Sequence, residues 1–407
     1  MRKVRREFAR IFRNSASFLE RISRSVDPTL FWNGYSDPAS RTGFVKVRSV
    51  RSWCFEHDLS YTVIAPAKKT PVDRPKVIGT PPYEPRGGHA ELPEVYLARL
   101  RDVTIIGGTT IISPEPGVIL YDEIALSSGF PYGSRTPALE IRPALSCFPC
   151  SVGRVDRAVH FCKEGHSNYF HWLTDCLPRL MLTEHEPDLR GWPLLVDSDV
   201  PPQCMDALRR VTSREIINVP HKACIEVGEL AFPSELSVLH DRYEGTVDLE
   251  RDIVLRPESL LFTREKLLGK RRAEPRTKIY VSRANGRYRK LLNEQEIIRH
   301  VKRRGFSIVS PEEMTLDEQI DIFSNASHIV GPTGAGFANM LFAPQGCQAT
   351  VLVGDNANTN LYFLNQIAHA FSIDLTYVVG SEVAGRFMPA VHNDYSVDIS
   401  LLDLAIG

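Results

Sequence analysis

The sequence predicts an α/β protein built from two Rossmann-like domains that face a cleft. The first observation is length, because 407 residues exceed what a single compact core usually holds. The second is the alternation of short apolar runs with helical stretches between residues 278 and 379, which is typical of a parallel sheet. The third is a shorter series of the same kind over residues 157–219. We therefore expect one α/β unit in each half of the chain.

The second half gives the clearest expectations. Strands are expected at residues 278–282, 306–310, 328–330, 348–353 and 375–379, and helices at 293–304, 315–325, 337–342 and 360–371. Two of these helices are expected to begin with a capping box, which pairs Asn293 with Glu296 and Thr315 with Glu318. Ligands of parallel sheets bind at the carboxyl ends of the strands, so a binding site is expected there.

The first half predicts a β-meander followed by the shorter α/β series. Runs rich in β-branched residues at 103–106, 109–112 and 118–121 are separated by glycine and proline. Beyond them we expect strands at 157–161, 194–197 and 215–219, with helices at 168–184, 202–211 and 257–268. These elements divide the chain into an N-terminal domain (31–250), a C-terminal domain (251–390) and a C-terminal tail (391–407).

Residues 1–30 predict a basic amphipathic helix. The apolar side chains Phe8, Ile11, Phe12, Phe18, Leu19 and Ile22 recur at helical spacing among eight lysine and arginine residues. Such a helix can lie on an anionic membrane surface, dock on the body of the protein or contact a second subunit. These three interpretations stay open at the sequence level.

Composition narrows the class of protein. Lysine plus arginine and aspartate plus glutamate both number 49, so no global field favours nucleic acid as a partner. The N-terminus has no apolar core of a secretory signal, and no apolar run is long enough to span a membrane. The eight cysteines include one CxxC pair, Cys147 and Cys150, without a second pair. We interpret them as reduced thiols of a cytoplasmic protein.

The stretch SHIVGPTGAGFANMLF at residues 327–342 is the most informative part of the chain. A short apolar run leads into the turn Gly334-Ala335-Gly336, and a helical stretch follows from Phe337. A strand, a glycine turn and a helix leave backbone N–H groups and a positive helix end free to hold an anion. Glycine would permit a positive-φ turn and close approach of phosphate. An ordinary turn between a strand and a helix explains the same residues.

The stretch HSNYFHWLTDCLPRL contains the candidate catalytic residues. Asn168, His171 and Asp175 share one face of the expected helix, and Arg179 continues it beyond Pro178. A histidine and an aspartate four residues apart can form a general base with its orienting partner. The alternatives are a solvated polar face with Asn168 as N-cap, or a zinc site with His166, for which no third ligand has a recognisable spacing.

An arginine cluster and an aspartate pair also bear on ligand binding. Arg283, Arg287 and Arg289 follow a strand of the C-terminal domain, where guanidinium groups suit a diphosphate. Asp197 and Asp199 form a DxD, a pattern that chelates metal but also arises by chance.

The segment 334–339 also nearly fits the dinucleotide fingerprint GxGxxG, with Asp355 at the end of the next strand. Asn339 stands in place of the third glycine, so an NAD(P)-dependent oxidoreductase is the weaker alternative.

Taken together, these stretches resemble glycosyltransferase family 61, including its bacterial capsular-polysaccharide members. The resemblance covers residues 95–380 and rests on blocks in a fixed order. The blocks are Asn168…His171…Asp175-Cys-Leu-Pro-Arg179, YVSR at 280–283, Asn293-Glu294, Glu318-Gln319 and GPTGAGFANMLFAP at 331–344. Many members have histidine where this chain has Thr333, and a threonine cannot carry a proton at neutral pH. Any acid–base role therefore moves to the N-terminal domain.

The resemblance implies a GT-B fold, an inverting mechanism and a nucleotide-sugar donor bound by the C-terminal domain. We expect Asp175 or His171 to be the base, with Asn168 and Arg179 binding or supporting the acceptor, a glycan or lipid-linked glycan. The expected donor-binding residues are Arg283, Thr333, Gly334, Ala335, Gly336 and Asn339. No metal and no cofactor are expected, because fixed dipoles and arginines can offset the diphosphate charge. A non-catalytic protein that binds sugar nucleotides or polysaccharide is the alternative from another class.

Overall fold

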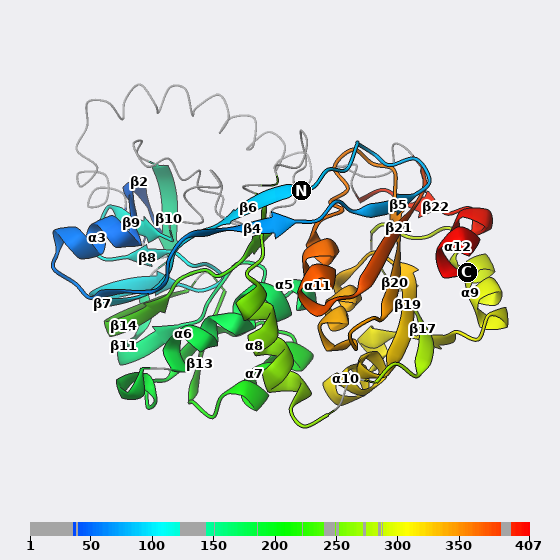
Figure 1. Cartoon of the computed structure of the whole chain (residues 1–407). Helices are drawn as coiled ribbons and strands as arrows, with labels where there is room; N and C mark the ends of the chain where they lie inside the picture. Colours follow the sequence, from blue (N-terminus) through cyan, green and yellow to red (C-terminus); the bar gives the residue numbers. More distant parts are fainter. Residues whose placement is uncertain are drawn as a thin grey trace, which may run out of the picture.

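The computed structural model describes residues 36–37, 40–122, 144–149, 151–184, 186–221, 223–239, 249, 252–271, 274–283, 286, 288–383 and 392–407. Two large sheets lie in the two halves of the molecule, with helices between them (Figure 1). Several strand pairs in each sheet are parallel, so the predicted α/β class is confirmed. The expected helix at residues 1–30 lies outside the described residues.

The second sheet follows the predicted order of elements. Its main strands are β17 (Thr277–Val281), β18 (Ser307–Val309), β19 (Ala326–Pro332), β20 (Gln348–Gly354) and β21 (Asp374–Glu382). In space their order is β18-β17-β19-β20-β21, and every neighbouring pair is parallel. The carboxyl ends of these strands therefore meet at one edge, where the sequence predicted a binding site.

Helices α9 (Glu294–Arg303), α10 (Leu316–Ser324) and α11 (Phe363–Phe371) connect these strands. The capping box of Thr315 and Glu318 is confirmed at the start of α10. The one predicted for Asn293 and Glu296 is wrong, because the Asn293 side chain makes no capping bond. Its amide instead pairs with the backbone of Val397, which fastens α9 to the C-terminal segment.

The first sheet is mixed, in the order β1-β2-β9-β8-β7-β14-β11-β12-β13, with β10 beside β2 and β3 beside β7. Its strands are β1 (Ser36–Asp37), β2 (Ser40–Ser49), β3 (Tyr61–Ala65), β7 (Val95–Ile106), β8 (Ile112–Ser113), β9 (Val118–Tyr121), β10 (Ala144–Pro149), β11 (Ser151–His160), β12 (Leu194–Asp197), β13 (Ile216–Val219) and β14 (Cys224–Pro233). The antiparallel run β7-β8-β9 is the predicted meander. Helix α3 (Val50–Glu56) precedes β3, and α7 (Pro202–Val211) joins β12 to β13 as expected.

The helix expected over 168–184 is broken into four pieces. They are α5 (Tyr169–His171), a π-helical turn η1 (Trp172–Cys176), a 3-10 turn η2 (Leu177–Leu180) and α6 (Met181–Glu184). Pro178 has no N–H to continue an α-helical ladder, and the change in helix type surrounds it. The predicted segment is helical throughout but not one straight helix.

Two segments cross the predicted domain limits. Strand β5 (Lys76–Ile78) pairs with β21, although residues 31–250 were assigned to the N-terminal domain. In the sequence it comes between β4 (Lys68–Val72) and β6 (Gly88–Leu92), which pair with each other, but in space it lies beside β21 (Figure 1). Strand β22 (Tyr395–Ser396) pairs with β21, and α12 (Ile399–Ile406) buries Leu402. Residues 392–407 therefore complete the second sheet and are not a separate tail.

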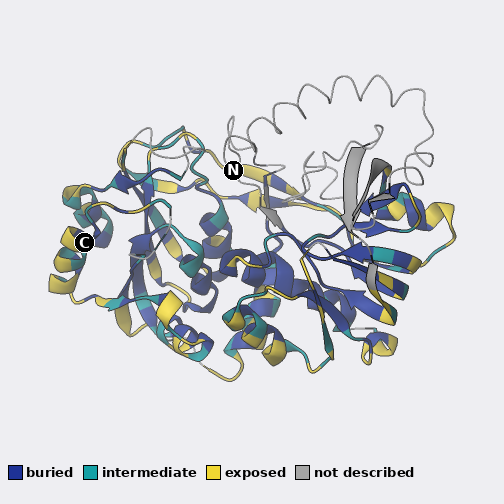
Figure 2. Ribbon diagram, turned by 180° about the vertical axis from the view of Figure 1, so that it is seen from behind, coloured by how far each residue is buried: buried dark blue, intermediate teal, exposed yellow. Residues whose placement is uncertain are grey.

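A continuous buried core joins the two halves. One cluster of buried side chains includes Val159 and Leu194 of the first sheet, Leu260 of α8 (Pro257–Leu268), and Ile279 and Ala349 of the second sheet. Figure 2 shows the buried residues filling both sheets and the helices between them. The remaining elements are short: β15 (Val238–Leu239), β16 (Ile253–Val254), and the 3-10 turns η3 (Pro187–Leu189), η4 (Pro311–Glu313) and η5 (Ala335–Phe342).

No helix in the described part of the chain is long and apolar enough to cross a membrane. Six cysteines with described side chains, at positions 54, 162, 176, 204, 224 and 347, are free and buried. The Cys147 and Cys150 pair lies outside the residues with described side chains.

Candidate active site

A pocket opens at the carboxyl ends of the parallel strands of the second sheet. Its walls are formed by Asn168, Phe170, His171, Arg289, Thr333, Gly334, Ala335, Gly354, Asn356, Asn358, Thr359, Asn360, Phe363, Leu364, Glu382, Asn393 and Tyr395. Three of these residues come from the start of α5, in the first half of the chain. The pocket therefore brings together the two stretches that the sequence singled out, residues 168–179 and 327–342.

The glycine turn forms one wall, with a geometry that differs from the expected one. Thr333, Gly334 and Ala335 line the pocket, and the helix that follows is the 3-10 turn η5. Gly334 has φ 175°, which is extended backbone, and the expected positive φ is wrong. A Cβ at 334 would lie 3.0 Å from the Cδ and Nε atoms of Arg283, so the Arg283 side chain would have to shift to make room for it.

Gly336 does not line the pocket. A Cβ at Gly336 would meet Pro311 at 3.5 Å and Val281 at 3.6 Å, which are ordinary contacts on the side of η4 and β17. A Cβ at Gly331 would come within 2.4 Å of the Val281 carbonyl oxygen, so Gly331 serves the close packing of β19 against β17. The expected contact of Gly336 with phosphate has no support in this geometry.

Arg283 fixes the glycine turn from behind. Its Nη1 donates to the Thr333 carbonyl oxygen at 2.6 Å, and its backbone N–H donates to Glu294 Oε1 at 3.0 Å. Burial, reinforced by the positive charge of Arg289, lowers the pKa of Arg283 to about 10. The two guanidinium groups repel each other, and an anion between them would relieve that repulsion.

Arg289 is the arginine that reaches the pocket wall. It has φ +55°, an uncommon conformation for a residue with a side chain. Its backbone N–H donates to the His392 carbonyl oxygen at 3.1 Å. Its Nε is buried and has no hydrogen-bond partner among the described residues. A buried donor of this kind is available to a ligand. Arg287, the third arginine of the motif, lies outside the described residues.

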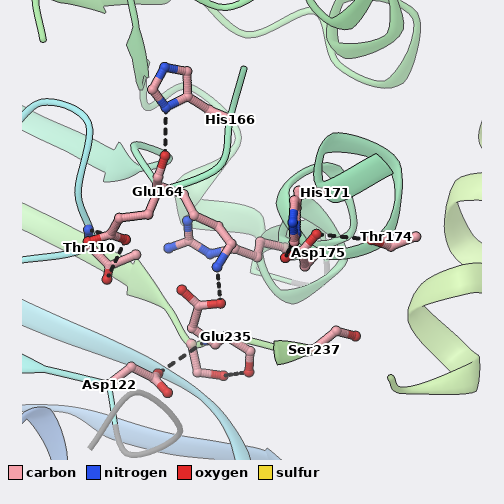
Figure 3. Close-up of polar contacts among 12 residues, drawn as sticks. Thr110, Asp122, Glu164, His166, His171, Thr174, Asp175, Glu235 and Ser237 are labelled. Carbon is pink, nitrogen blue, oxygen red and sulfur yellow. Dashed lines mark hydrogen bonds and ion pairs between the residues drawn. The ribbon is translucent and has the colours of Figure 1, made fainter. Parts of the chain in front are cut away.

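His171 and Asp175 form the expected pair. His171 Nδ1 lies 3.1 Å from Asp175 Oδ2, and Thr174 Oγ1 donates to Asp175 Oδ1 at 3.0 Å (Figure 3). His171 lines the pocket, whereas Asp175 is buried and lies outside its lining. A carboxylate that accepts from Nδ1 fixes the tautomer and the orientation of the ring. This geometry favours His171 as the group that meets a substrate.

A buried polar network extends from Asp175 into the first half of the protein, and the sequence reasoning missed it. Lys163 Nζ donates to Glu235 Oε2 inside the protein. Burial disfavours the charged ammonium, but the carboxylates of Glu235 and Asp175 outweigh it and raise the pKa of Lys163. Asp122 Oδ2 accepts from the backbone N–H of Glu235 at 3.1 Å (Figure 3).

Glu164 belongs to the same region. Its Oε2 accepts from the backbone N–H and the hydroxyl of Thr110 at 3.2 and 3.3 Å, and its Oε1 has no partner in the described part of the chain. Burial raises the pKa of Glu164 to about 7, although Lys163 acts in the opposite direction. The adjacent charged pair Lys163-Glu164, directly after the apolar residues Phe161 and Cys162, was the signal in the sequence.

Asn168 and Arg179 occupy different environments. Asn168 lines the pocket and caps α5, since its Oδ1 accepts from the Phe170 N–H at 2.9 Å. Arg179 is fully buried, and its Nη2 donates to the carbonyl oxygens of Pro233 at 2.9 Å and His160 at 3.3 Å. Arg179 therefore ties the ends of β11 and β14 to the broken helix and supports the site without lining the pocket.

Asn339 also serves packing. Its Oδ1 accepts from the Tyr169 hydroxyl at 2.8 Å, and its Nδ2 donates to Gln319 Oε1 at 2.8 Å. The side chain is fully buried and lies outside the pocket lining. These contacts join α5, η5 and α10, and they do not fit the expected role of Asn339 in donor binding.

The DxD holds a loop in place. Asp197 accepts from the backbone N–H groups of Gly108 and Lys163, and Asp199 Oδ1 lies 2.8 Å from His166 Nε2. His166 is thus held between the Lys163 carbonyl oxygen and Asp199. Among the described residues, no group of three or more histidine, cysteine or acidic side chains could hold a metal ion.

The dinucleotide fingerprint does not fit the geometry either. The turn follows β19, which comes after β17 and β18 in the sequence, and leads into a 3-10 turn where the fingerprint requires an α-helix. Asp355 faces the end of β21, where its Oδ1 accepts from the Glu382 N–H at 2.8 Å.

Much of the pocket was not predicted from the sequence. Its largest unpredicted part consists of Asn356, Asn358, Thr359, Asn360, Glu382 and Asn393. The run DNANTN after an apolar strand was the available signal, because polar loops at the carboxyl ends of parallel strands commonly bind ligands.

Comparison with known proteins bears on the resemblance noted in the sequence. Residues 169–351 match the family model described as Glycosyltransferase 61. The match begins at α5 and ends within β20, so it contains the His171–Asp175 pair and the glycine turn. No match was found among curated proteins.

Proposed function

The match over residues 169–351 supports membership of glycosyltransferase family 61, and on this basis we propose an inverting glycosyltransferase that moves a sugar from a nucleotide-sugar donor to a glycan acceptor. One observation carries the proposal: His171, oriented by Asp175, shares a pocket with the turn Thr333–Ala335. A general base and an anion-binding turn in one pocket are what transfer from a diphosphate-activated sugar requires.

In this proposal the donor occupies the second sheet and the acceptor approaches from the first, as in a GT-B arrangement. The pocket residues support this division, because most of them come from the strand ends of the second sheet and three from the start of α5. A role in capsular or other surface polysaccharide synthesis, with a lipid-linked glycan as acceptor, rests on the sequence resemblance.

The donor diphosphate lies along Thr333–Ala335 and contacts Arg289. Arg283 acts through the turn, since its guanidinium holds the Thr333 carbonyl oxygen. As the bond between the anomeric carbon and the diphosphate oxygen breaks, its electron pair passes to the leaving diphosphate. Positive charge and backbone dipoles that are already in place stabilise this growing charge most in the transition state.

His171 takes the proton from the attacking hydroxyl. Nδ1 is directed at Asp175, so Nε2 is the ring nitrogen that accepts this proton. The hydroxyl oxygen then forms the new bond to the anomeric carbon on the face opposite the leaving group, which inverts the configuration. Asp175 stabilises the imidazolium that results, as a buried carboxylate beside a histidine does in other enzymes.

The test is an assay of nucleoside diphosphate release with UDP-, GDP- and CDP-sugars, with and without glycan acceptors. We expect acceptor-dependent turnover of one donor, unaffected by EDTA, because Asp197 and Asp199 are bonded within the first half of the protein. Donor binding without turnover by any acceptor would instead favour a non-catalytic binding protein. Activity lost in EDTA and restored by manganese would overturn the metal-independent mechanism.

A further inference from the structure

One part of the pocket wall has no role in the proposed mechanism. It contains a carboxylate held between two side-chain amides. Glu382, the last residue of β21, accepts from Asn356 Nδ2 at 2.9 Å on Oε2 and from Asn393 Nδ2 on Oε1. All three residues line the pocket. A carboxylate offers about four acceptor positions, and these two bonds occupy one on each oxygen. The carboxylate can therefore accept further hydrogen bonds from a ligand.

Asn360 supplies an unused donor in the same pocket. Its Oδ1 accepts from the Tyr362 N–H at 2.9 Å, which fixes the orientation of the amide. Its Nδ2 is buried and has no hydrogen-bond partner among the described residues. Buried donors without a partner are rare in folded proteins, so this one requires an explanation. A ligand oxygen in the pocket would satisfy it.

The loop that carries these groups is already ordered by its own contacts. Asn356 Oδ1 accepts from the Asn358 N–H at 2.9 Å, and Thr359 Oγ1 donates to the Gly354 carbonyl oxygen at 3.1 Å. The backbone N–H of Glu382 donates to Asp355 Oδ1 at 2.8 Å. The groups that accept and donate hydrogen bonds are therefore held in place before a ligand arrives. This lowers the entropic cost of binding.

The combination identifies a class of ligand. A carboxylate accepts and an amide N–H donates, and each hydroxyl of a vicinal diol can both donate and accept. A phosphate at the same position would place two anions in contact, which disfavours it. A neutral group rich in hydroxyls therefore matches these two side chains better than an anion does.

We propose that Glu382 and Asn360 bind a vicinal diol of the donor, with Asn356 and Asn393 holding the carboxylate. This inference rests on the proposed function, since it assumes a nucleotide-sugar donor. Two parts of such a donor carry a vicinal diol, the ribose of the nucleoside and the transferred sugar.

The experiment is calorimetry with UDP, GDP and CDP, their 2′-deoxy counterparts and the corresponding nucleotide sugars. The protein is the full chain, as wild type and as Glu382→Gln, Asn360→Ala and Asp374→Asn. Asp374→Asn is the matched control, because it removes a carboxylate from the other end of β21, outside the pocket lining.

If the diol is that of ribose, the wild type binds the 2′-deoxy nucleotide about tenfold more weakly, and this difference shrinks in Glu382→Gln and Asn360→Ala. If the diol is that of the transferred sugar, the wild type binds nucleotides and their 2′-deoxy counterparts equally well. Both variants then lose the additional affinity that the sugar of the nucleotide sugar provides. Either result supports the inference.

If both variants bind every ligand as tightly as the wild type, the inference about the diol is overturned. The proposed function still stands in that case, because the protein binds a nucleotide. No binding of any nucleotide to the wild type would refute the proposed function first. Should Glu382→Gln fail to fold, Asn360→Ala and the deoxy nucleotides still decide the question.

Discussion

At the residue scale, the structure separates side chains that face the pocket from those that hold them. His171 and Arg289 line the pocket, while Asp175 and Arg283 lie behind them. Asp175 contacts the His171 ring, and Arg283 donates to the Thr333 carbonyl oxygen. The two arginines of one motif, Arg283 and Arg289, thus have different positions relative to the pocket, which the sequence pattern cannot distinguish.

The first prediction concerns the base. His171→Gln should lower kcat by about 10² to 10⁴-fold, the usual contribution of general base catalysis. Asp175→Asn should lower kcat and shift the pH profile, because the amide no longer holds the same tautomer. Donor binding measured by calorimetry should survive in both. Full turnover by His171→Gln together with loss of turnover by Asp175→Asn would make Asp175 the base.

The second prediction uses Glu164, whose pKa burial raises to about 7 from an ordinary 4.5. Between these values the folded chain retains a proton that the unfolded chain releases. Stability from the neutral carboxyl is complete below pH 4.5 and is lost as the pH rises through 7. Glu164→Gln stays neutral, so its unfolding free energy relative to wild type should rise by up to about 3 kcal/mol between pH 5 and pH 8.

Urea unfolding of both proteins at the two pH values measures this difference. Glu265→Gln, at an exposed position on α8, is the control and should show no such change. A difference between wild type and Glu164→Gln that does not vary with pH would show that the carboxyl is not protonated in the folded state.

At the scale of elements, the turn between β19 and η5 depends on its contact with Arg283. The segment has no positive φ, so its glycines are needed only where another group approaches closely. Gly334 meets Arg283 and Gly331 meets β17, whereas Gly336 has room for a methyl group. Three glycines of one motif thus have three different requirements.

The third prediction compares two alanine variants in this turn. Gly334→Ala should displace the Arg283 side chain from the Thr333 carbonyl oxygen and weaken donor binding, by about 1 kcal/mol or roughly fivefold. Gly336→Ala should bind the donor like the wild type, because its Cβ would make only ordinary contacts. Calorimetry with the donor nucleotide measures both. Equal affinities in the two variants would show that Arg283 does not position the turn.

At the scale of the whole molecule, segments distant in sequence complete the second sheet. Strand β5 adds an edge to the second sheet, and β22 joins it next to the loop that carries Arg289. Tyr362 donates to the Arg86 carbonyl oxygen at 3.2 Å and further connects the β4–β6 region to the second sheet. The surroundings of the pocket therefore include residues 76–86 as well as the strand β22.

The fourth prediction concerns residues 1–26, which carry the Phe and Ile side chains among eight basic residues. We propose that this segment brings the enzyme to the inner face of the cytoplasmic membrane as a peripheral protein. Its deletion should reduce binding to anionic liposomes and leave turnover of a soluble acceptor unchanged. Cosedimentation with liposomes of anionic and neutral lipids measures the difference. Equal liposome binding by the deleted protein would leave docking on the protein or on a second subunit as the role of the segment.

The sequence by itself determined the five main strands of the second sheet, the helices that connect them and two of the stretches that line the pocket. Apolar periodicity locates β19, β20 and α10 because each buries one face or one run against the same core. His171 and Asp175 were found together because their spacing is local, and a helical turn preserves it even where the helix becomes π-helical.

Only the tertiary structure decided which polar residues face the pocket. Glu382, Asn360 and Arg289 come from different loops, and they meet because parallel strands end at one edge. Asn339 and Gly336, although inside the most informative motif, turn towards the core because Tyr169, Gln319 and Pro311 pack there. Side-chain direction depends on contacts between distant segments, and no local pattern in the sequence contains that information.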